Sequence, residues 1–125
     1  MTPGIPASSA KSFVTLTTKN KHLIARFDAV SIGPREATAI AGEVATALGT
    51  AVKGKCLVID LSRTNSLSSM GLGLCVDLRN RAVDAGLRPV LTGMNVHLAD
   101  LFQMMRVDRL FAIATTTTEV ERLLL

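Results

Sequence analysis

The chain has 125 residues, of which 48% are hydrophobic, and its formal net charge at pH 7 is +4. This length suits one domain with a single core. The chain has four Phe and no Trp or Tyr, which argues against an aromatic platform that stacks the bases of a single-stranded nucleic acid. Its Lys and Arg residues are spread along the sequence without a block, so nucleic acid is not an expected partner.

The first ten residues, MTPGIPASSA, lack the charged start and apolar middle of a signal peptide. We expect residues 1–11 to be a flexible tail and residues 12–125 to form one domain. Cys56 and Cys75 fall in apolar runs and are expected to be buried free thiols, in a cytoplasmic protein. No His/Cys cluster has metal-ligand spacing, so neither a metal nor a cofactor is expected. No apolar run reaches the roughly 18–20 residues that span a bilayer, so no direct membrane insertion is expected.

The first elements are a hairpin and a helix. SFVTLTTKN (12–20) and HLIARFDA (22–29) predict two strands joined by a very short polar turn. Residues 33–49 predict a helix, because Pro34 suits its first position, Glu36 suits the positive end of its dipole and Gly49 suits its end.

Strands and helices then alternate. Residues 55–62 predict a strand covered on both faces, and a helix is expected from about 69 to 84. A buried strand over 88–93 precedes a helix over 96–105, which Asn95 can cap. Residues 110–115 predict a last strand. Thr118 and Glu121 have the spacing of a capping box, which predicts a short final helix.

This order indicates an α/β fold. Alternating strands and helices imply right-handed crossovers and a mostly parallel sheet, with the first strand antiparallel at an edge. We expect a mostly parallel or mixed sheet of about five strands, with about four helices packed on it.

The stretch NSLSSMGLG (65–73) joins a predicted strand to a predicted helix and raises the question of catalysis. A hydrolase elbow would place a glycine before the serine at a spacing that is absent here. His22 and His97 are the available imidazole bases, and both are expected on the surface. Gly71 and Gly73 lack the third glycine of a dinucleotide fingerprint. The chain is therefore not expected to be an enzyme.

Two interpretations of the serine pair remain open. Ser68 is a preferred residue type for the helix N-cap, which is a purely structural role. The free amides and positive dipole at the same place also stabilise an anion. A phosphate on Ser69 would add about −1.5 to −2 charges there and alter the surface that a partner meets.

The stretch LVIDLSRTNSLSSMGLGLCVDL (57–78) resembles the signature of STAS domains, which are found in sulphate transporters and bacterial anti-sigma factor antagonists. The family's signature Asp falls on Ser68, and its phosphoacceptor Ser falls on Ser69. Met70 takes the place of a second hydroxyl residue, and the family's Gly-Leu-Gly falls on residues 71–73. Arg106 stands where many members have a Gly that ends a helix.

This resemblance implies an anti-sigma factor antagonist-like module that binds an anti-sigma factor acting as a serine kinase, without nucleic acid, as a monomer or weak dimer. Phosphorylation at Ser69 would switch that binding. The implied partner surface comprises two loops and the first turn of the helix, with the candidate residues Asp28, Ser31, Arg63, Asn65, Ser68, Met70 and Leu72. The alternative is a non-catalytic STAS subunit of an ABC-type lipid transport complex.

Overall fold

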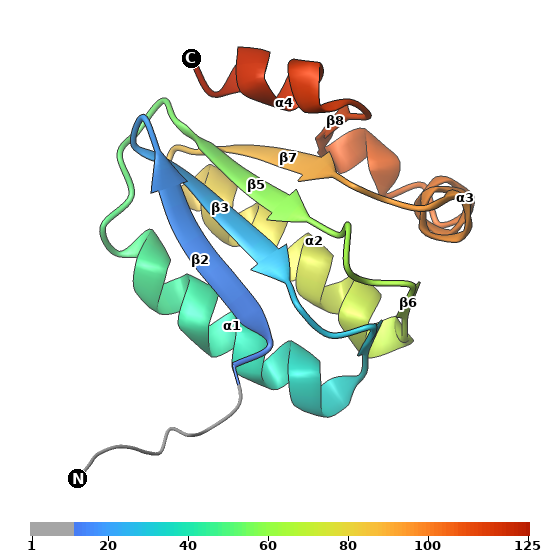
Figure 1. Cartoon of the computed structure of the whole chain (residues 1–125). Coiled ribbons are helices and arrows are strands. Elements are labelled where there is room, and N and C mark those ends of the chain that lie inside the picture. The colour runs from blue at the N-terminus through green and yellow to red at the C-terminus, as the bar shows by residue number, and fades with distance from the viewer. Residues whose placement is uncertain (1–11) are drawn as a thin grey trace, which may run out of the picture.

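Five strands form one mixed sheet in the computed structural model, which describes residues 12–125 (Figure 1). The predicted tail over 1–11 lies outside the described residues. The strands are β2 (Val14–Lys19), β3 (His22–Phe27), β5 (Cys56–Asp60), β7 (Arg88–Thr92) and β8 (Ala112–Ala114), and they lie side by side in that order. β2 and β3 pair antiparallel, and the other neighbouring pairs are parallel. The predicted mixed sheet of five strands is confirmed.

A two-residue turn joins β2 to β3. Asn20 and Lys21 have φ angles of 51° and 70°, and Lys19 pairs with His22 across the turn. Positive φ at both central residues is the mark of a type I′ turn, whose twist matches that of the two strands. The predicted hairpin is confirmed.

Helices cover both faces of the sheet unequally. α1 (Pro34–Leu48) and α2 (Ser69–Asp84) pack on one face, where they meet inward side chains such as Leu57 and Ile59 in the main core. α4 (Thr117–Leu123) lies along the other face beside β7 and β8 (Figure 1). The smaller cluster on that face is Cys56, Val58, Val90, Ala114 and Leu124. Both cysteines are buried and free, as expected.

The last two elements differ from the sequence prediction. β8 is shorter than expected, because a 3-10 helix, η1 (Asp108–Leu110), takes up Leu110. α4 is capped by Thr116 and not by Thr118, so the predicted capping box was two residues late. Glu119 accepts hydrogen bonds from the amides of Thr115 and Thr116 at 3.0 and 3.1 Å, which settles the choice among four consecutive threonines.

His22 is buried, with 4% of its surface exposed, so the prediction of a surface residue was wrong. Its Nδ1 accepts a hydrogen bond from the Cys56 amide at 2.9 Å. The imidazole therefore satisfies a backbone donor at the start of β5. His97, in contrast, is exposed as expected, on α3 (Val96–Met104), which Asn95 caps through Leu98 N at 2.7 Å.

A short second sheet was not predicted. β4 (Ser31–Ile32) and β6 (Ser66–Leu67) pair in parallel where the chain leaves β3 and β5 (Figure 1). Two residues are too few to show a period in the sequence. This pair brings the loop before α1 against the loop before α2.

Candidate partner-binding surface and phosphoacceptor

Ser68 fastens the loop before α1 to the first turn of α2. Its Oγ accepts a hydrogen bond from Gly71 N at 3.1 Å and donates one to Ile32 O at 2.9 Å. Its own amide also donates to Ile32 O, at 3.0 Å. The predicted N-cap is confirmed, and the same hydroxyl joins two segments that lie 36 residues apart in sequence.

Gly71 lets β4 approach α2 closely. A Cβ atom at this position would lie 2.6 Å from Ile32 O, well inside van der Waals contact. A Cβ at Gly73 would meet no atom within 4 Å. Of the two glycines in the motif, the first is therefore required by the packing of this chain, and the second is not.

Ser69 is the first residue of α2 and is exposed. Within residues 12–125, its hydroxyl makes no hydrogen bond, whereas the Ser68 hydroxyl makes two. Met70 follows with 53% of its surface exposed. Both line a shallow groove between α1 and α2, of about 270 Å³, whose other lining residues are Ala37, Thr38, Ala41, Gly73, Leu74 and Asp77. A free hydroxyl at the positive end of a 16-residue helix is well placed to carry an anionic group.

Hydrogen bonds between the two loops make one continuous surface beside Ser69. The hydroxyls of Ser31 and Ser66 are 2.8 Å apart, and Asn65 N donates to Val30 O at 2.7 Å. The buried hydroxyl of Thr64 donates to Ala29 O at 2.9 Å. These bonds hold Ser31 and Asn65 in fixed positions. The side chain of the neighbouring Val30 is exposed to solvent.

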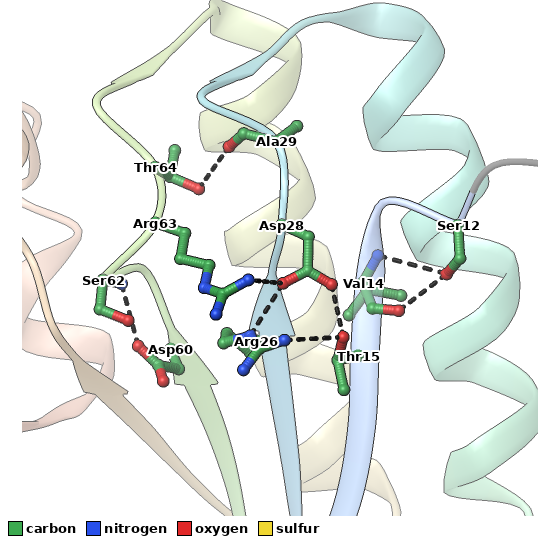
Figure 2. A network of polar contacts seen from close by, with 10 residues as sticks. All are labelled: Ser12, Val14, Thr15, Arg26, Asp28, Ala29, Asp60, Ser62, Arg63 and Thr64. Atoms are coloured by element: carbon green, nitrogen blue, oxygen red, sulfur yellow. Dashed lines mark hydrogen bonds and ion pairs between the residues drawn. The ribbon is translucent and has the colours of Figure 1, made fainter.

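A polar network fixes the start of the loop after β3 (Figure 2). The Asp28 carboxylate accepts hydrogen bonds from Thr15 Oγ1 and from Arg26 Nε, the latter at 2.8 Å, and it lies 3.9 Å from Arg63 Nη1. Burial raises the pKa of Asp28, but the hydrogen bonds from Thr15 and Arg26 and the charges of Arg26 and Arg63 outweigh it. The pKa of this carboxyl is therefore below its ordinary value of 3.8.

Replacing Asp28 by Asn tests this network. Because the folded-state pKa is lowered, the ionised carboxylate stabilises the fold above the unfolded-state pKa, and that contribution is lost as the pH falls through the folded-state pKa. Asp28→Asn is expected to lower the free energy of unfolding by about 1 kcal/mol at neutral pH. Urea unfolding of both proteins measures the difference, which should shrink towards pH ~3. An equal difference at both pH values would contradict this assignment.

Six of the seven predicted contact residues lie on this end of the molecule with side chains at least partly exposed: Asp28, Ser31, Arg63, Asn65, Ser68 and Met70. Leu72 lies in the main core with 9% exposed, so its side chain is not offered to a partner. The two predicted loops also contain Val30, Thr64 and Ser66, which were not named as contact candidates. The Val30 side chain is exposed, Ser66 is half-buried and paired with Ser31, and Thr64 is buried.

In the part of the chain that the structure describes, no group of three His, Cys, Asp or Glu side chains is arranged to hold a metal ion. None of the helices in that part is both long enough and apolar enough to cross a bilayer.

The family described as "Mlab, STAS domain" matches residues 31–115. The chain belongs to the STAS domain family. The match runs from β4 through β8 and includes Ser68 and Ser69, whereas Asp28 and Val30 precede it. No curated protein sequence matches the chain.

Solved STAS structures share this fold. An anti-sigma-factor antagonist (STAS) domain protein from Planctomyces limnophilus superposes with a TM-score of 0.78 at 18% identity, over 89% of this chain and 96% of that one. RsbS from Moorella thermoacetica gives 0.73 at 21% identity, over 88% and 93%. SpoIIAA, a Bacillus cell fate determinant, in its phosphorylated form gives 0.66 at 16% identity, over 87% and 97%.

Arg106 is a departure from the STAS pattern just after α3. Arg106, where the resemblance implies a Gly, follows α3 with a φ angle of 60°. This left-handed conformation favours glycine and closes the helix end. An arginine adopts this conformation at some conformational cost.

Proposed function

We propose that this STAS domain is a regulatory binding module of the anti-sigma factor antagonist type. Its partner is an anti-sigma factor that is also a serine kinase, and phosphate on Ser69 switches the binding. The observation that carries the proposal is the contrast between the two serines. Ser68 is engaged in holding the loops, whereas Ser69 is exposed and, among the described residues, its hydroxyl is free.

The exposed side chains of this surface support a binding role. The unmodified surface offers the exposed side chains of Val30 and Met70 to the kinase. It also offers the hydroxyl of Ser31 and the side-chain amide of Asn65. A phosphate on Ser69 adds about −1.5 to −2 charges at the positive end of α2, where the fold tolerates them. The partner must then desolvate that charge, so the complex weakens. Holding the kinase releases its sigma factor, and phosphorylation reverses the release.

The test uses the chain, ATP and a candidate anti-sigma factor kinase. Intact-mass spectrometry should show one phosphate on the wild-type chain and none on Ser69→Ala. Ser69→Glu should weaken kinase binding on the order of tenfold or more. Ser66→Ala is the matched control, because it removes a nearby hydroxyl that is already paired with Ser31. A phosphate that persists on Ser69→Ala would refute the assignment of the site.

A second candidate function is a non-catalytic subunit of an ABC-type lipid transport complex, in which the same loops contact the ATPase and no phosphate is needed. Ser68 favours it, because this cap is neutral where the phosphorylated relatives are expected to have Asp. The family description "Mlab, STAS domain" names no anti-sigma factor. If the chain co-purifies with an ATPase, and if Ser69→Glu does not reduce that co-purification, the result would select this candidate.

A further inference from the structure

Five basic side chains that are scattered in the sequence meet at the amino end of the parallel strands. This is the end where β2 finishes and β3, β5 and β7 begin, and it lies opposite β6 and the start of α2 (Figure 1). Four of the five are exposed, and the other is half-buried. We call this surface the basic end, and its residues are Lys19, Lys21, Lys53, Lys55 and Arg88.

Strand pairing makes the basic end continuous. Arg88 pairs with Cys56, and its amide donates to Lys55 O at 2.9 Å. Cys56 N in turn donates to His22, which pairs with Lys19 at the end of β2. Neighbouring strands lie about 4.8 Å apart, so Lys19 at the end of β2, Lys55 just before β5 and Arg88 at the start of β7 lie at the same end of the sheet.

The chain itself neutralises little of this charge. Within residues 12–125, none of the five cations forms a salt bridge; the pairs that do form join Arg26 and Arg63 to Asp28, and Arg81 to Asp77. The stem of Lys53 packs against Gly86 just after α2, where a cation suits the negative end of the helix dipole.

Exposed apolar side chains accompany the cations. Val52 adjoins Lys53, and Val83 lies in the last turn of α2. Leu125 is also exposed, and its carbonyl lies 3.5 Å from Nε2 of His22, which pairs with Lys19. Basic residues interspersed with exposed aliphatic ones are typical of surfaces that rest on anionic lipid headgroups.

We propose that the basic end binds the surface of an anionic phospholipid membrane. The lysines reach phosphate groups while their stems, with Val52 and Leu125, contact the upper acyl region. Nucleic acid fits this end less well, since it consists of turns and strand starts and offers neither a helix for a groove nor an aromatic residue for stacking. The inference does not rest on the proposed function, because Ser69 lies at the opposite end and stays accessible on a membrane.

Co-sedimentation of the full chain with lipid vesicles tests the proposal. The chain should pellet with phosphatidylcholine vesicles that contain phosphatidylglycerol, and not with phosphatidylcholine alone. Binding should fall strongly between about 0.1 M and about 0.5 M salt. The triple variant Lys19→Gln, Lys21→Gln, Lys53→Gln should bind at least about tenfold more weakly, since each cation near an anionic surface contributes several-fold.

The matched control neutralises three exposed cations elsewhere: Arg35→Gln, Arg106→Gln and Arg109→Gln. Each triple variant lowers the net charge from +4 to +1, and circular dichroism verifies that both are folded. Retained binding in the control together with loss in the first variant supports the basic end. Equal loss in both, binding independent of phosphatidylglycerol, or tighter binding to duplex DNA than to vesicles at the same salt would overturn the proposal.

Discussion

Gly71→Ala is expected to lower the free energy of unfolding by about 2 kcal/mol, because its new methyl group would lie 2.6 Å from Ile32 O. The Ile32 carbonyl oxygen belongs to the backbone, so it cannot move aside as the end of a flexible side chain can. Either β4 must leave α2, which breaks both hydrogen bonds to Ile32 O from Ser68, or the helix must shift on the sheet. Thermal unfolding should show a loss of several degrees, at about 4 °C per kcal/mol.

Gly73→Ala is the matched control, two residues along the same helix. Its Cβ meets nothing within 4 Å, and alanine has the better helix propensity, so this variant should gain up to about 1 kcal/mol. The two variants therefore move in opposite directions. If Gly71→Ala were as stable as wild type, the close approach of β4 to α2 would be wrong, and so would the surface built on it.

His22→Leu is expected to lower the free energy of unfolding by about 2 kcal/mol, since it leaves the buried Cys56 amide without an acceptor. His22→Asn offers a side-chain oxygen in place of Nδ1 and should lose less. Urea unfolding gives the stabilities. Hydrogen exchange at the Cys56 amide distinguishes the loss of this hydrogen bond from a general loss of stability. In the leucine variant, protection of that amide should fall more than protection of the other core amides.

A different result would locate the role of His22 elsewhere. Equal losses for His22→Leu and His22→Asn would mean that the imidazole acts through its packing against β5 and the last residues of the chain. That outcome would contradict the assignment of its Nδ1 as the acceptor for Cys56.

Local patterns predicted most of this fold. The hairpin, the helix after Pro34 and the caps at Ser68 and Asn95 depend on a few neighbouring residues, and the structure has all of them. The cap of α4 failed because four successive threonines are equivalent in sequence. Only the folded contacts of Glu119 distinguish Thr116 from Thr118.

The candidate surface was predicted in part. Ser69 was named because the family's phosphoacceptor falls on it, and its side chain is exposed. Leu72 was mistaken for a contact, because it shares the first turn of α2 but faces the core. The Ser31–Ser66 pair and the cluster of Lys19 with Arg88 could not be foreseen. Both depend on strand order and register, which bring together residues that are far apart in the chain.

The two cysteines occupy different sides of the sheet, and this makes each a reporter of its own layer. Cys56 lies in the cluster beneath α4, and Cys75 lies in the main core, where burial raises its pKa to about 12. Neither thiol reacts readily with an alkylating reagent while it is covered. Alkylation of Cys56 alone would record the lifting of α4, and alkylation of both would record global opening, without any label having to be engineered.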